Sequence, residues 1–196
     1  MQPTDPTKPQ LREYRGTLRV DEEPGGKKFQ GVWLEHGGEK RWVIAYRPSP
    51  LWRAFAEQEV IVIGHCFQPF GQAINAPHFR IATLRYAAPP GRISVPYLGM
   101  GPEQWITGSF STMTFPAGSK RAGDREQRFV DEHGTSYHVA GLDQEPPNGP
   151  ATIHERVLER NMAYTASTGG NDVWVIEVHP RGYTAPVSRD TPIDCP

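Results

Sequence analysis

The sequence is poor in cysteine and in long apolar runs. Its 196 residues contain 2 cysteines, too few for a disulfide framework, so we expect reduced thiols and a cytoplasmic protein. Apolar runs such as Val60–Ile63 are far shorter than the roughly 20 residues that cross a bilayer. The first residues also lack the apolar stretch of a secretory signal. We therefore expect no membrane contact.

Net charge and aliphatic residues are scarce as well. The 21 Lys and Arg residues nearly balance the 22 Asp and Glu residues, so no overall field draws the chain to nucleic acid or to an anionic membrane. Leu, Ile, Val and Phe together supply 39 residues, close to the composition at which chains stop folding. The 5 Trp and 7 Tyr residues add large buried areas, which favours a folded domain.

Glycine and proline are abundant, with 20 residues of each, and they interrupt helices. This composition excludes a helical bundle and favours an all-β protein. The chain also contains an internal repeat, because residues 11–86 and 104–180 share one order of expected elements. Each copy has a glycine in its first strand, Gly16 and Gly108, and a Glu-His-Gly hairpin tip, at 35–37 and 132–134.

Each copy continues into a segment with helical spacing, Pro50–Glu59 in the first and Pro150–Arg160 in the second. Proline at the first position suits the first turn of a helix, where no backbone donor is lost. Two further strands are expected to follow in each copy. They are Val60–Phe67 and His78–Tyr86, then Asn161–Ala166 and Asp172–His179.

The order of three strands, a short helix and two strands resembles the OB-fold, a small five-stranded barrel. The resemblance implies two tandem OB-like barrels, each with one helix between its third and fourth strands. The expected organisation is a disordered tail (1–10), barrel 1 (11–86), a Pro/Gly-rich junction (87–103), barrel 2 (104–180) and an extended tail (181–196).

Catalytic signatures are weak. The 7 histidines stand in separate elements with no metal-ligand spacing, so we expect neither metal nor cofactor. Cys66 directly follows His65, so on a strand the two side chains point to opposite faces and cannot pair as nucleophile and base. We expect Cys66 to be a small buried apolar residue. The chain is therefore expected to be non-catalytic.

A binding surface is the remaining expectation. The resemblance implies a ligand face on the second and third strands, where aromatic side chains can stack on bases. Residues 11–86 also carry 11 basic and 8 acidic side chains, whereas residues 104–180 carry 6 and 10. The candidate ligand-binding residues of barrel 1 are Trp33, Trp42, Tyr46, Lys27, Lys28, Lys40 and Arg41.

Three classes of function follow. The first is a protein-binding or scaffolding module that uses exposed strand edges and the Pro/Gly junction, with another protein or a second copy of the chain as partner. The alternative is single-stranded nucleic-acid binding by barrel 1. The third is a hydrolytic or metal-dependent enzyme whose site forms only in three dimensions. The near-zero net charge favours the first class, since binding of single-stranded nucleic acid depends on clustered Lys and Arg.

Overall fold

The fold is all-β in a computed structural model, which confirms the expected class. The structure describes residues 9–22, 30–38, 40–71, 74–88, 95–144, 146–161 and 171–196. The chain divides into two compact units. Unit 1 comprises Met1–Arg92 and Val187–Pro196, and unit 2 comprises Ile93–Pro186. No helix in the described ranges is long and apolar enough to span a membrane.

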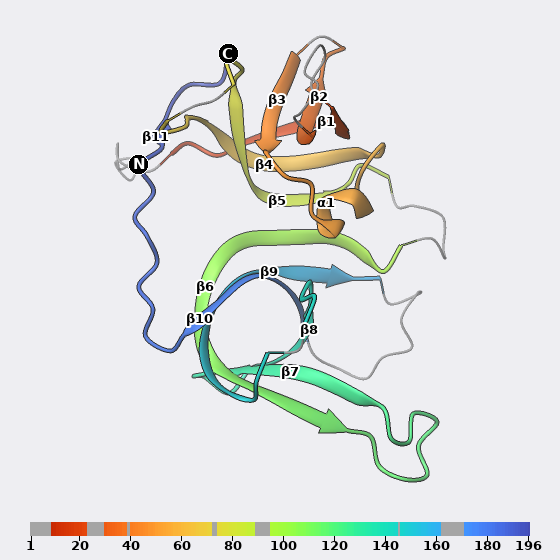
Figure 1. Cartoon of the computed structure of the whole chain (residues 1–196). Helices are drawn as coiled ribbons and strands as arrows, with labels where there is room; N and C mark the ends of the chain where they lie inside the picture. The colour runs from red at the N-terminus through yellow and green to blue at the C-terminus, as the bar shows by residue number, and fades with distance from the viewer. Residues whose placement is uncertain are drawn as a thin grey trace, which may run out of the picture. The chain divides into compact units, whose positions relative to one another are not determined.

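Unit 1 contains six strands and one short helix in its described part (Figure 1). They are β1 (Arg12–Glu22), β2 (Gln30–His36), β3 (Lys40–Ala45), α1 (Pro50–Ala54), β4 (Glu59–Gln68), β5 (His78–Tyr86) and β11 (Thr191–Pro192). The pairings run β4–β1–β2–β3–β5 and return to β4, so these five strands form a closed ring, here called ring 1. Among the described strands of ring 1, only β3 and β5 pair in parallel.

The core of ring 1 follows from strand alternation. Along β4, Val60, Val62 and Cys66 are buried while their neighbours are more exposed, so these side chains point into the ring. Helix α1 is shorter than the expected Pro50–Glu59: it ends at Ala54, a turn with Glu57 at a φ of 60° follows, and β4 begins at Glu59. It buries Leu51 and Trp52.

Unit 2 contains five strands in its described residues. They are β6 (Tyr97–Thr114), β7 (Arg125–Asp131), β8 (Ser136–Ala140), β9 (Gly149–Arg160) and β10 (Asn171–Pro180). The pairings run β6–β7–β8–β10–β9 and return to β6, and we call this closed set ring 2. Of the ring 2 pairings that the described residues make, that of the third and fifth strands, β8 and β10, is again the parallel one. The core contains Phe110, Phe129, Tyr137, Ala151, Ile153, Val173 and Val175.

The helix expected over Pro150–Arg160 is wrong, because these residues form strand β9. Ala151, Ile153 and Glu155 are buried on one face with the period of two that a strand requires. Arg156 reaches across to β6 and donates to the carbonyl oxygen of Gly101 at 2.7 Å. The strand expected at 161–166 falls outside the described residues from 162 onward.

Close approach between strands explains the glycine at the start of each ring. A Cβ atom on Gly16 would lie 2.4 Å from the Glu35 carbonyl oxygen, and one on Gly108 would lie 2.2 Å from the Val130 carbonyl oxygen. Both glycines lie in the first strand of their ring and face the second. A side chain at either position would push the two strands apart.

The expectation of reduced thiols is also wrong. Cys66 on β4 forms a disulfide with Cys195, 129 residues away, and their Cα atoms lie 5.1 Å apart. The last ten residues, Val187–Pro196, therefore belong to unit 1, and we call them the C-terminal strap. Its strand β11 pairs with Phe67 and Gln68 at the end of β4. Figure 1 shows β11 beside β4.

Candidate functional site

The two tryptophans expected to form a stacking platform are buried. Trp33 is 4% exposed and Trp42 is 1% exposed, so neither ring is open to a base. Trp42 pairs with Leu34 across the β2–β3 register and therefore shares the core face, whereas Trp33 pairs with Val43 on the opposite face. The expected platform is thus divided between two sides of the sheet.

Of the other candidates, only Tyr46 has a side chain that the structure describes. Tyr46 is 38% exposed, and its hydroxyl lies 2.6 Å from Nε2 of the buried His78. Burial, with the charge of Asp190, raises the pKa of Tyr46. Lys40 and Arg41 lie in β3, where only their backbone is described. Lys27 and Lys28 lie outside the described residues.

The outer side of ring 2 carries a regular array of polar and aromatic side chains. Cross-strand pairing of β6, β9 and β10 places three rows on one face, which we call the ring 2 outer face. The rows are Glu103, Arg156 and Trp174; Trp105, His154 and Glu177; and Thr107, Thr152 and His179.

Stacked rings occupy the middle of the ring 2 outer face. The Trp105 and His154 ring centroids lie 4.5 Å apart with an interplanar angle of 4°. After β10 the chain turns back, so that Tyr183 stacks on His179 at 3.8 Å and lies 5.3 Å from Trp105. Tyr183 is 40% exposed, so this aromatic group reaches solvent.

An ionic group borders these rings. Glu103 accepts from Arg156 at 2.8 Å and lies 3.5 Å from Nε2 of His154. Burial acts to raise the pKa of Glu103, but the hydrogen bond from His154 and the charge of Arg156 outweigh it and lower that pKa to about 2. Glu103 therefore remains ionised and fixes the position of Arg156, which is only 2% exposed.

Glu155, between His154 and Arg156, points the other way, into ring 2. It is 0% exposed, and its cross-strand neighbour Val175 belongs to the core. Neither carboxyl oxygen makes a hydrogen bond of good geometry within the described residues, although Gln104 lies close enough to oppose part of the effect of burial. Burial raises the pKa of Glu155 to about 7. The core of ring 2 thus contains a carboxyl group that is half protonated near neutral pH.

Strand β10 is paired on both sides over only part of its length. Residues 171–174 pair with β8, whereas pairing with β9 continues to Pro180. A β-bulge lies between Val175 and Glu177. Beyond it, residues 176–180 have no described strand on the β8 side, and we call this stretch the free edge. Ile176 and Val178 on it are 41% and 39% exposed.

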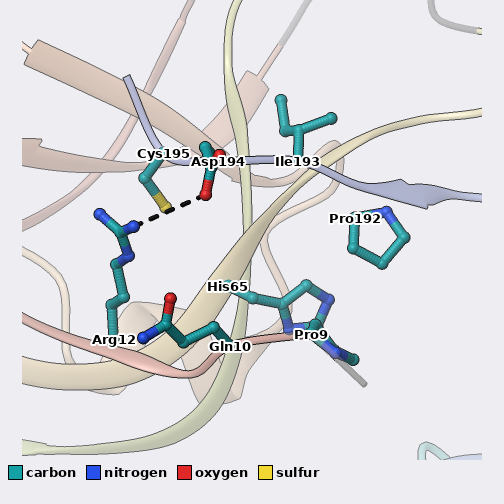
Figure 2. Close-up of a pocket in the computed structure, with 8 residues that line it drawn as sticks. All are labelled: Pro9, Gln10, Arg12, His65, Pro192, Ile193, Asp194 and Cys195. Carbon is teal, nitrogen blue, oxygen red and sulfur yellow. Dashed lines mark ion pairs between the residues drawn. The ribbon is translucent and has the colours of Figure 1, made fainter. Parts of the chain in front are cut away.

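Unit 1 has a pocket of about 230 Å³ beneath the C-terminal strap, here called the strap pocket. Its lining residues are Pro9, Gln10, Arg12, His65, Pro192, Ile193, Asp194 and Cys195. Figure 2 shows Arg12, Asp194 and Cys195 toward one end, with His65 between Pro9 and Pro192 at the other. The Arg12 guanidinium lies 3.6 Å from the Asp194 carboxylate.

His65 contributes a neutral imidazole to the strap pocket. Burial, and secondarily the positive charge of Arg80, lowers the pKa of His65. Its Nδ1 atom is buried and has no hydrogen-bond partner among the described residues. Nothing in the sequence indicated this pocket, since its residues come from positions 9–12, 65 and 192–195.

No group of three or more His, Cys, Asp and Glu side chains that could hold a metal ion occurs in the part of the chain that the structure describes. Comparisons with protein-family models, with curated proteins and with solved structures find no match to this chain.

Proposed function

We propose that the chain is a non-catalytic binding protein of two OB-like barrels, which binds an extended segment of a partner protein at the free edge of β10. The OB-like assignment is supported by the ring pairings, since both rings follow the order first, second, third, fifth, fourth strand. A parallel pair of third and fifth strands in each ring is further support.

The free edge is the observation that carries the binding proposal. Among the described residues, no strand pairs with 176–179 on the side that β8 has left, and an unpaired strand edge is a template for another strand. Pro180 ends this edge, because it lacks an N–H and its carbonyl oxygen accepts from the Tyr183 backbone N–H at 3.2 Å. Recognition by strand addition takes its affinity from backbone hydrogen bonds and its specificity from alternate side chains. Ile176 and Val178 supply exposed apolar contacts beside that edge.

The charge of unit 2 defines the chemistry of the partner. Residues 104–180 carry 10 acidic and 6 basic side chains, and Glu177 lies half exposed at the free edge. The partly exposed ring of Tyr183 stacks on His179, a residue of that edge, and adds a π surface that attracts a cation. We therefore propose a partner segment that is extended, basic and apolar at alternate positions, because opposite charge favours association and apolar residues match Ile176 and Val178.

The experiment compares the wild-type protein with a variant carrying Ile176→Asp and Val178→Asp. Proteins captured from an extract of the producing cells are purified, and their affinities for both forms are measured by titration. We expect the double variant to lose at least tenfold in affinity. Met113→Asp, at a site 37% exposed on β6, is the matched control and should bind as wild type. Equal affinity of the double variant would contradict the free-edge assignment, and absence of any purified binder would contradict the binding function.

We propose further that the protein works in an oxidising compartment and not in the cytoplasm. The Cys66–Cys195 disulfide supports this location, because cytosolic thiols are kept reduced. Intact-mass analysis of protein taken directly from cells, with free thiols blocked at lysis, is the test. Two blocked cysteines would contradict the proposed location.

A further inference from the structure

The two sulfur atoms of the disulfide differ in access. Cys66 is 0% exposed and lies opposite Phe79 inside ring 1. Cys195 is partly exposed and lines the strap pocket. Thiol–disulfide exchange requires a thiolate to reach one sulfur along an open path, so access decides which of the two is attacked. In this fold the attacked sulfur is that of Cys195.

The strap pocket also selects by charge. Arg12 lies toward the same end as Cys195 (Figure 2), with its side chain 42% exposed. Its ion pair with Asp194 is long at 3.6 Å, and the Asp194 side chain is 98% exposed, so solvent competes for that contact. Because burial lowers the pKa of His65, its neutral imidazole adds no positive charge to the pocket. Among the described residues that line the pocket, Arg12 is therefore the cation that meets an incoming molecule.

We propose that Cys195 is a modification site, at which a low-molecular-weight thiol bearing a carboxylate enters the strap pocket and forms a mixed disulfide. The thiol first gives its proton to water. Its thiolate sulfur then bonds to Sγ of Cys195, and the Cys66–Cys195 bond breaks. The electron pair leaves on Sγ of Cys66, which takes a proton from solvent. The incoming thiol is oxidised and Cys66 is reduced, so no other oxidant or reductant is consumed.

Exchange releases the end of the C-terminal strap. Without the disulfide, residues beyond Asp190 are held by the two-residue strand β11, by the Ile193 backbone N–H donating to the Cys66 carbonyl oxygen at 3.0 Å, and by the loose Arg12 contact. Asp190 stays anchored, because it pairs with Arg80 and accepts from the Phe70 backbone N–H at 3.0 Å. The modification thus weakens the attachment of residues 191–196 to β4.

This inference is independent of the free edge, and native wild-type protein tests it. The protein is incubated with excess glutathione at pH 7.5, acid-quenched at intervals, and mapped by mass spectrometry. We expect one glutathione per chain, at Cys195, with Cys66 recovered as a thiol. A glutathione adduct on Cys66, equal adducts on both cysteines, or adducts that form only in urea would overturn the proposal.

Charge selection is tested with Arg12→Met. For each protein the rate constant with glutathione is divided by that with 2-mercaptoethanol, a neutral thiol, so that any loosening of the strap cancels. We expect this ratio to fall about fivefold in Arg12→Met, as for the loss of one unit charge about 4 Å away in water. Arg15→Met is the control, because Arg15 lies on the same strand outside the pocket. An unchanged ratio in Arg12→Met would overturn the assignment of a carboxylate-bearing thiol.

Discussion

Replacing Glu155 by Gln should stabilise unit 2 above neutral pH and leave it nearly unchanged in acid. Burial raises the pKa of Glu155 from 4.5 in the unfolded chain to about 7 in the folded one. Between these values the folded protein holds a proton that the unfolded chain has lost, so the free energy of unfolding falls as pH rises. Glutamine has nearly the same shape and no such proton.

The size of the effect follows from the two pKa values. Each unit of difference is worth 1.36 kcal/mol, so the interval from 4.5 to about 7 corresponds to about 3 kcal/mol. This contribution is fully present below pH 4.5 and is lost as pH rises through 7. The pKa of Glu103 is lowered to about 2, so its stabilisation is lost only as pH falls below 4.5. The two carboxylates therefore act in separate pH windows.

Urea unfolding of wild type and Glu155→Gln at pH values from 4.5 to 8.5, followed by tryptophan fluorescence, measures the difference. We expect the variant to gain stability progressively with pH, to a plateau of about 3 kcal/mol above pH 7. Glu159→Gln is the control, since Glu159 is exposed on the same strand. Its replacement removes one carboxylate charge but no buried carboxyl group. A stability difference between wild type and Glu155→Gln that does not change with pH would refute the reasoning.

Three further outcomes are expected. Gly108→Ala should destabilise the protein by about 3 kcal/mol in urea unfolding, because its Cβ meets a carbonyl oxygen at 2.2 Å, whereas Gly101→Ala, with its nearest atom at 3.6 Å, should be nearly neutral. Replacing Cys66 and Cys195 together by alanine should cost about 4 kcal/mol in the same assay, since the disulfide closes a long loop in the unfolded chain. Trp33→Ala should not change the affinity for labelled single-stranded DNA at low salt, measured by fluorescence anisotropy, because Trp33 is buried. DNA binding by the wild type that Trp33→Ala abolishes would restore the nucleic-acid alternative.

Strand periodicity was strong enough to predict the fold class. Alternating burial along Val60–Phe67 matches β4, and the Glu-His-Gly tips at 35–37 and 132–134 lie at or beside the turns of the β2–β3 and β7–β8 hairpins. Residues 150–160 were misread because Ile153 and Val157 also satisfy helical spacing. Their contacts with β6 and β10, which decide for a strand, come from segments far away in the sequence.

The candidate site was less predictable, since each of its features depends on distant residues. Trp33 and Trp42 are nine residues apart in the sequence, and only the hairpin register assigns them to opposite faces. The cysteines are separated by 129 residues, a spacing that gave no sign of pairing. The free edge of β10 exists because β8 is short. The bulge lies within Val173–Glu177, where four apolar residues in a row give no alternation from which to place it.

The C-terminal strap also sets an order of folding during synthesis. Every residue of unit 2 precedes Val187–Pro196 in the chain, and these last residues belong to unit 1. On the ribosome, where segments fold in the order in which they emerge, unit 2 can therefore be complete while unit 1 still lacks β11 and Cys195. Unit 1 therefore begins to emerge first but completes its fold last, and the Cys66–Cys195 disulfide can form only at that final stage.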